Sequence, residues 1–185
     1  MGMKKELSVV CIAILLVTIY LSGCTENNDT GPLSNLAWSN AEYGIGFDPP
    51  AGWDEDTTDY GVFPIVIFFG PRLQGYTYFV LSLSIYILGP LKENETLESI
   101  VEMQNVDPQD TLVYSEAKTV NGMNAYERII KQTTEISSET IITLSRHMYV
   151  EKNRELYIIS YIALEEVYLT YKPVVDNSIE TFTVI

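Results

Sequence analysis

Residues 111–132 read TLVYSEAKTVNGMNAYERIIKQ, and this stretch decides the fold class. It holds two runs of strand character, Thr111–Thr119 and Met123–Gln132, with Asn121-Gly122 between them. Asn-Gly is favoured in two-residue hairpin turns of type I′, because both turn positions need a positive φ angle. We therefore expect the two runs to be antiparallel neighbours in a β-sheet.

Several further segments have strand patterns. Apolar and polar side chains alternate along Tyr76–Leu88, which is typical of a strand with one face on the core. Val62–Phe69 is dense in β-branched and aromatic residues and is predicted to be buried on both faces. The remaining expected strands are Tyr43–Phe47 and a second hairpin of Thr140–Val150 with Leu156–Ala163, turning at residues 151–154.

Two segments have the period of an amphipathic helix. In Asn94–Gln104 the apolar residues recur at spacings of three and four, and Asn94 or Thr96 can cap the first turn. The same spacing runs from Leu164 to Phe182, with a kink or restart expected at Pro173. Together these elements predict an α+β fold, an antiparallel sheet of about six strands flanked by helices.

The first residues have the pattern of an export signal. A basic start is followed by the uncharged run LSVVCIAILLVTIYL, which is shorter than the roughly 20 residues of a spanning helix. The run ends in Leu21-Ser22-Gly23-Cys24, which resembles the lipobox of prokaryotic lipoproteins. We expect a signal peptide over residues 1–23, a lipidated Cys24 with a flexible tether over 24–36, and one domain over 37–185. An uncleaved signal anchor is the alternative, and either reading places the domain outside the cytoplasm.

Composition restricts the partners. The 185-residue chain has a net charge of −14, so phosphate backbones repel it and nucleic acid is excluded as an expected partner. The chain has two cysteines, Cys11 in the signal run and Cys24 at the lipobox, which leaves no thiol for a disulfide, a zinc site or a nucleophile. The expected partners are a membrane, reached through the lipid anchor, and a protein.

Two stretches resemble one known family. Residues 40–53, NAEYGIGFDPPAGW, resemble the N-terminal motif of PsbP-like (Mog1/PsbP-like) domains, in which a Tyr-Gly strand precedes a proline and a Gly-Trp pair. Residues 158–163, IISYIA, with the proline-containing helix after them, resemble the C-terminal segment of the same family. The resemblance implies an α/β/α sandwich and a binding, assembly or adaptor role without catalysis. Prokaryotic members of the family that this sequence resembles are commonly exported lipoproteins.

The residues that could carry chemistry are few. His147 is the only histidine, and it shares one face of its expected strand with Ser145. Neither a nucleophile elbow nor an orienting carboxylate accompanies this pair, so we predict an ordinary sheet histidine, no enzyme activity and no cofactor.

Two other sites are predicted on the exported domain. A loop after Trp53 carries four carboxylates, which are ligands that Ca²⁺ or Mn²⁺ accepts: Asp54, Glu55, Asp56 and Asp59. Their spacing does not match an EF-hand, and solvated surface is the plain alternative. Asn94-Glu95-Thr96 is a glycosylation sequon.

The leading hypothesis is therefore a membrane-tethered, extracytoplasmic, non-catalytic binding or assembly domain. A cation-binding accessory protein is the alternative, and an enzyme of another type would require a deep pocket with perturbed titratable groups. The aromatic segment Val62–Phe69 is the expected partner surface, provided that it leaves an exposed patch.

Overall fold

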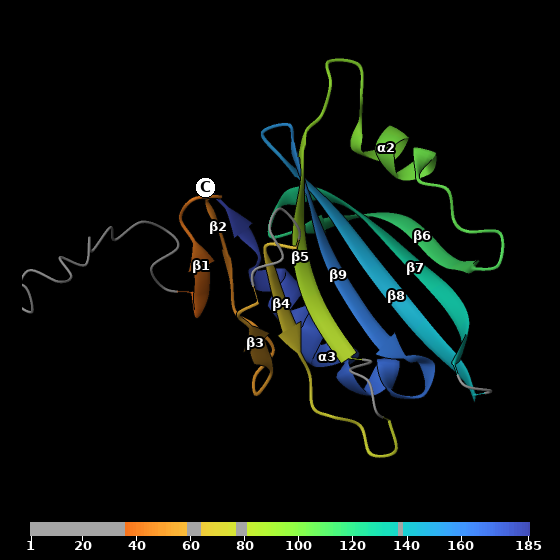
Figure 1. Ribbon diagram of the computed structural model, residues 1–185. Coiled ribbons are helices and arrows are strands. Elements are labelled where there is room, and N and C mark those ends of the chain that lie inside the picture. The colour runs from red at the N-terminus through yellow and green to blue at the C-terminus, as the bar shows by residue number, and fades with distance from the viewer. Residues whose placement is uncertain (1–35, 59–63, 77–80, 137–138) are drawn as a thin grey trace, which may run out of the picture. The chain divides into compact units, whose positions relative to one another are not determined.

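The Asn121-Gly122 hairpin forms one edge of a seven-stranded antiparallel sheet in a computed structural model, which describes residues 36–58, 64–76, 81–136 and 139–185 (Figure 1). The strand order across the sheet is β3-β4-β5-β9-β8-β7-β6. The bounds are β3 Asp54–Asp56, β4 Val66–Phe69, β5 Leu81–Pro90, β6 Thr111–Val120, β7 Met123–Ile136, β8 Glu139–Lys152 and β9 Glu155–Leu164. The sheet thus has seven strands where the sequence predicted about six.

The additional strand is β3. Its sequence, Asp-Glu-Asp, has little strand propensity, so it was expected to be part of a loop. Backbone pairing with β4, from Asp54 opposite Phe69 to Asp56 opposite Ile67, makes it an edge strand. Tertiary pairing therefore overrides the local preference of these three residues.

Both hairpin turns use backbone conformations that L-residues rarely adopt. Asn121 and Gly122 have φ angles of 44° and 75°, which confirms the expected type I′ geometry. Asn153 and Arg154 have φ angles of 53° and 66° at the turn between β8 and β9. The second turn is therefore two residues long, and β8 and β9 extend further than the sequence indicated.

Helix α3 (Glu165–Thr181) packs on one face of the sheet and contributes Tyr168, Val175 and Ile179 to the main core. Met148 and Val150 of β8 reach the same core. The helix continues through Pro173, where a kink or restart was expected. Pro173 is exposed, and a proline costs a helix least where water can satisfy the carbonyl that loses its donor.

Helix α2 (Leu97–Met103) packs on the opposite face, against β7 and β8. Tyr149 lies between Met148 and Val150 in sequence and points to the other face of the sheet. There it forms a smaller core with Leu97 and Val101 of α2. The N-cap is Thr96, which was one of the two residues predicted to cap this helix. Thr96 and Ser99 form a reciprocal capping box. Because α2 covers only one end of its face, the structure does not confirm a full α/β/α sandwich (Figure 1).

A second, three-stranded sheet joins the two ends of the described chain. It consists of β1 (Trp38–Asn40), β2 (Ile45–Phe47) and β10 (Thr183–Val184), with β2 in the middle. Phe47 meets Phe68 of β4 edge to face, with ring centroids 5.6 Å apart. Trp53 packs against the main core. None of the helices in the described part of the chain is long and apolar enough to cross a membrane.

Candidate functional site

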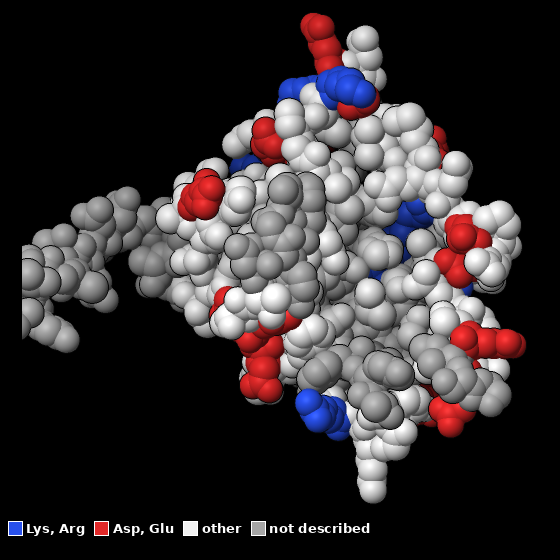
Figure 2. Space-filling view, in the orientation of Figure 1, with Lys and Arg blue, Asp and Glu red and all other residues white. Residues whose placement is uncertain are grey.

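A hollow of about 300 Å³ lies on the face of the sheet that carries α2, beyond the end of that helix. Its apolar walls come from three strands: Leu88 of β5, Ile130 of β7, and Ile158 and Ile162 of β9. Figure 2 shows this face of the molecule, where basic atoms lie recessed among uncharged side chains. The size is at the lower end of the range of small-molecule sites.

A polar row crosses the floor of the hollow. Strand register places Arg128 of β7 opposite His147 of β8, and His147 opposite Ser160 of β9. Residues that pair directly across strands point to the same face, so the three side chains lie side by side. All three line the hollow.

Arg128 lines the hollow and also donates hydrogen bonds to the end of helix α2. Its side chain is 6% exposed, and Nη1 donates to the carbonyl oxygens of Val101 at 2.9 Å and Gln104 at 2.8 Å. These bonds satisfy acceptors at the C-terminal end of α2, where a cation is also favoured by the helix dipole. The buried Nε–H has no acceptor, and no carboxylate in the described part of the chain forms an ion pair with the guanidinium.

His147 is held in its neutral form. Burial, and secondarily the nearby charge of Arg128, lower the pKa of His147 to about 4. Tyr149, whose ring centroid is 6.3 Å from that of His147, donates its hydroxyl to Oε1 of Gln104 at 2.6 Å. At neutral pH the imidazole therefore offers one donor and one acceptor but no charge.

Ser145 shares the sheet face with His147, as expected, but its hydroxyl donates to Oε1 of Gln132 at 2.8 Å. In a serine hydrolase the histidine bonds the nucleophile and is oriented by a carboxylate. Here the charged neighbour of His147 is an arginine, so the geometry does not favour that chemistry.

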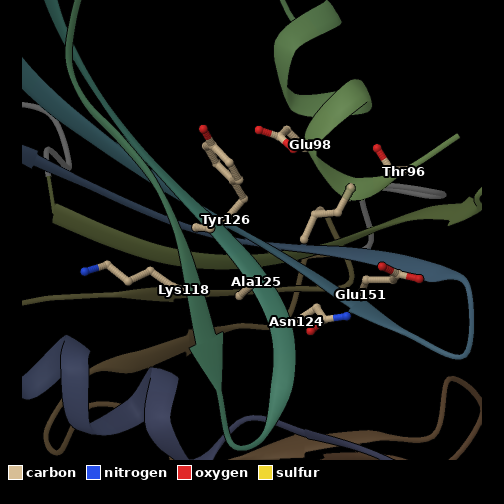
Figure 3. A pocket seen from close by; sticks show the side chains of 9 residues that line it. Thr96, Glu98, Lys118, Asn124, Ala125, Tyr126 and Glu151 are labelled. Atoms are coloured by element: carbon tan, nitrogen blue, oxygen red, sulfur yellow. The ribbon is translucent and has the colours of Figure 1, made fainter.

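A second hollow, of about 360 Å³, lies between the start of α2 and the β6–β7 hairpin. Figure 3 shows Thr96 and Glu98 of the helix end near Tyr126 of β7 and Glu151 of β8. Lys118, the one basic side chain among its described lining residues, is already paired with Glu116 at 3.2 Å. This hollow has mixed charges and little apolar wall, so it has less of the character of a ligand site.

The predicted carboxylate cluster lies largely in strand β3. Asp54 and Asp56 share one face of the strand and Glu55 takes the other, because side chains alternate along a strand. Glu55 accepts a bond from Nε1 of Trp38, and Asp56 accepts one from the backbone N–H of Thr58. No group of three potential metal ligands occurs among the described residues. Asp59 lies outside these residues, so the cation site stays a prediction.

The other predicted sites are placed as follows. Cys24 lies outside the described residues, and its lipidation stays a prediction. Asn94 is exposed in the turn before α2, where a glycan could be attached, and its modification also stays a prediction. Within the expected partner surface Val62–Phe69, Val66 and Phe68 are each only 4% exposed, whereas Ile65, Ile67 and Phe69 are half-buried, so a partner role for this segment stays a prediction.

Arg128 was not predicted from the sequence. Glu127 and Arg128 are both buried, on opposite faces of β7, although two adjacent opposite charges are typical of a solvated pair. The usable signal was the alternation of Tyr126, Arg128 and Ile130, which places the cation on an apolar sheet face.

Three comparisons with known proteins bear on the fold. No protein-family model matches the chain, and no curated protein matches it by sequence. Among solved structures, it is similar to cyanobacterial PsbP (CyanoP) from Synechocystis sp. PCC 6803, with a TM-score of 0.53 and 16% identity over 80% of this chain and 91% of that one. LpqN of Mycobacterium tuberculosis, described as involved in cell envelope biogenesis, has a TM-score of 0.49 and 12% identity over 76% and 82% of the two chains. PA94 from Pseudomonas aeruginosa, of unknown function, has a TM-score of 0.48 and 12% identity over 78% and 84%. The chain therefore has the PsbP-like fold, as its sequence motifs indicated.

Proposed function

We propose that this protein is a membrane-tethered, extracytoplasmic binding or assembly domain without catalytic activity of its own. Its binding surface is the hollow bounded by β5, β7, β8 and β9. The lipobox and signal run support the tether and the compartment, and the hollow supports the binding role.

The observation that carries the binding role is the charge and polarity of the hollow. The chain has a net charge of −14, yet the described residues that line this hollow include no aspartate or glutamate and one arginine. Four aliphatic side chains form its walls. A concave apolar surface with a few convergent polar groups is the usual form of a binding site.

The same groups argue against catalysis. His147 lies beside a cation, and the Ser145 hydroxyl is bonded to Gln132 rather than left available as a nucleophile. The Tyr149 hydroxyl is bonded to Gln104, and burial raises the pKa of Tyr149 above its ordinary value. Neither hydroxyl is activated for proton transfer at neutral pH.

The tether follows from the lipobox. A thioether-linked lipid on Cys24 would hold the domain at the outer face of the membrane, with residues 25–36 as the connecting segment. Stable anchoring of this domain requires more than one acyl chain, because a chain with a net charge of −14 is repelled by anionic lipids.

The test is a pull-down from detergent-solubilised membranes with four forms of the full chain. The native chain is compared with Cys24→Ser, which removes the anchor, and with Ile130→Trp, which fills the hollow. Leu169→Trp is the matched control, because it adds the same side chain at a position on α3 that is 75% exposed and lies on the other side of the sheet.

The proposal predicts one membrane or envelope partner that is recovered with the native chain and with Leu169→Trp, and is reduced with Ile130→Trp and Cys24→Ser. Equal recovery with Ile130→Trp would refute the hollow as the binding surface. Equal partition of native and Cys24→Ser chains into the membrane fraction would refute the lipid tether.

A further inference from the structure

Two buried arginines of this sheet differ in their ion-pair partners. Arg146 and Arg128 are each 6% exposed and lie on opposite faces. Arg146 forms ion pairs with two carboxylates, Glu127 on the neighbouring strand and Asp176 on α3. Arg128 forms none with any described residue.

An unpaired buried guanidinium is unusual because burial removes the water that stabilises its charge. Two carbonyl oxygens at the end of α2 offset part of this cost, but they carry only partial charges. The Nε–H, with no acceptor, remains an unsatisfied donor. An anion bound in the hollow beside Arg128 would balance the charge of the guanidinium, whereas the Nε–H is covered by protein atoms and stays without an acceptor among the described residues.

We infer that the hollow binds a small carboxylate with an apolar body, whose carboxylate is held by Arg128. This inference rests on the proposed binding function and names the ligand class of the same site. The guanidinium supplies the positive charge that a carboxylate matches. The aliphatic walls of Ile130, Ile158 and Ile162 take the body of the ligand.

The charge of the site sets the charge of the ligand. Arg128 is the one cation among the described residues that line the hollow, and the neighbouring imidazole of His147 is neutral at physiological pH. One cation balances a monoanion, which favours a carboxylate over a dianionic phosphate. The absence of lining carboxylates among the described residues means that nothing in the hollow repels such a ligand.

The volume sets the size. A space of about 300 Å³ corresponds to about ten water molecules at roughly 30 Å³ each, so a ligand on the order of ten non-hydrogen atoms fits. Hexanoate is within this range and serves as the probe. Its neutral counterpart 1-hexanol, hexylammonium, and hexyl phosphate have the same six-carbon chain with different head groups.

The experiment is an NMR titration of the full chain in a non-ionic detergent, following the Nε–H signal of Arg128 and the methyl signals of Ile130, Ile158 and Ile162. Hexanoate is expected to shift all of these signals. Because a hydrogen bond to a charged group is worth more than a neutral one, 1-hexanol is expected to bind about tenfold or more weakly. Hexylammonium is expected not to shift the Arg128 signal.

Two variants and one control assign the effect. Arg128→Met is expected to lose at least about tenfold in hexanoate affinity while the affinity for 1-hexanol is retained. Ile130→Trp is expected to abolish the binding of both probes. Lys152→Gln removes one positive charge at the end of β8, outside the hollow, and is expected to leave both affinities unchanged.

Each other outcome overturns the inference in a distinguishable way. Equal affinity for hexanoate and 1-hexanol would leave an apolar binding site without a role for the charge, and the proposed function would stand. Tighter binding of hexyl phosphate would assign the site to phosphate esters. Absence of any shift at millimolar hexanoate would leave Arg128 as a helix-capping residue only. Should Arg128→Met fail to fold, the native titration and Ile130→Trp still decide between these outcomes.

Discussion

Replacement of His147 by glutamine is expected to change how stability depends on pH. Burial and the neighbouring Arg128 lower the pKa of His147 from its ordinary 6.5 to about 4 in the folded chain. Between these two pH values the unfolded state takes up a proton that the folded state does not. Stability is therefore full above pH 6.5 and is lost as the pH falls towards 4.

The magnitude follows from this pKa interval. One pH unit corresponds to about 1.4 kcal/mol, so the difference between 6.5 and about 4 corresponds to on the order of 3 kcal/mol of unfolding free energy. Glutamine fills similar space and can hydrogen bond, but it does not titrate. The variant should therefore keep this contribution at acid pH, where the native chain loses it.

The assay is urea unfolding of the native and His147→Gln chains at intervals between pH 3.5 and 7.5. Carboxylates also titrate in this range, but they do so in both chains, and His147 is the only histidine, so the difference between the two curves isolates this residue. The native chain should lose on the order of 3 kcal/mol relative to the variant from pH 7 to pH 4. Parallel curves would show that the pKa of His147 is the same in the folded and unfolded states, as for a solvated imidazole, and the electrostatic description of the hollow would be wrong.

Three other changes test the framework that holds the site. Arg146→Met leaves the carboxylate of Glu127, which is 5% exposed, with only the Lys118 ammonium at 3.9 Å, and should lower the unfolding free energy by about 3 kcal/mol. Lys131→Gln, at a half-exposed ion pair, should cost less than about 1 kcal/mol, and equal costs in urea unfolding would contradict the burial argument. Thr96→Ala removes the capping box of α2 and should cost about 1 kcal/mol, with loss of helical ellipticity as the second readout. Gly122→Ala forces a side chain into a φ angle of 75° and should cost about 1–2 kcal/mol; an unchanged melting temperature would show that the turn relaxes.

Local patterns predicted most of the sheet because they depend on neighbours in the chain. Asn121-Gly122 dictates a hairpin through its backbone preferences, and the alternation along β5 and the period of α3 follow from burial of one face. The strands β1, β3 and β10 escaped prediction because two or three residues are too short to show a period, and their formation depends on pairing with distant segments. The Asp54–Asp56 segment is the clearest case, since its composition indicates a loop.

The candidate site could not be found by the same route. His147 was recognised from the sequence as a strand residue on the polar face shared with Ser145, but its neighbour Arg128 lies on another strand, and only register brings the two together. Glu127 and Arg128 are adjacent in sequence, yet one enters a buried ion-pair network under α3 and the other caps α2. A sequence of two opposite charges does not reveal which of them will be left without a partner.

Local sequence features indicated the fold class and the hairpins, and they predict export and tethering through the lipobox. Each of these depends on local backbone preference, on composition, or on a short contiguous motif. The position of the hollow and the charges in it follow only from how the strands pair in three dimensions. A one-residue change of register would turn Arg128 and His147 to the other face, because side chains alternate along a strand. The site therefore exists only through the pairing of strands that the chain brings together from distant positions.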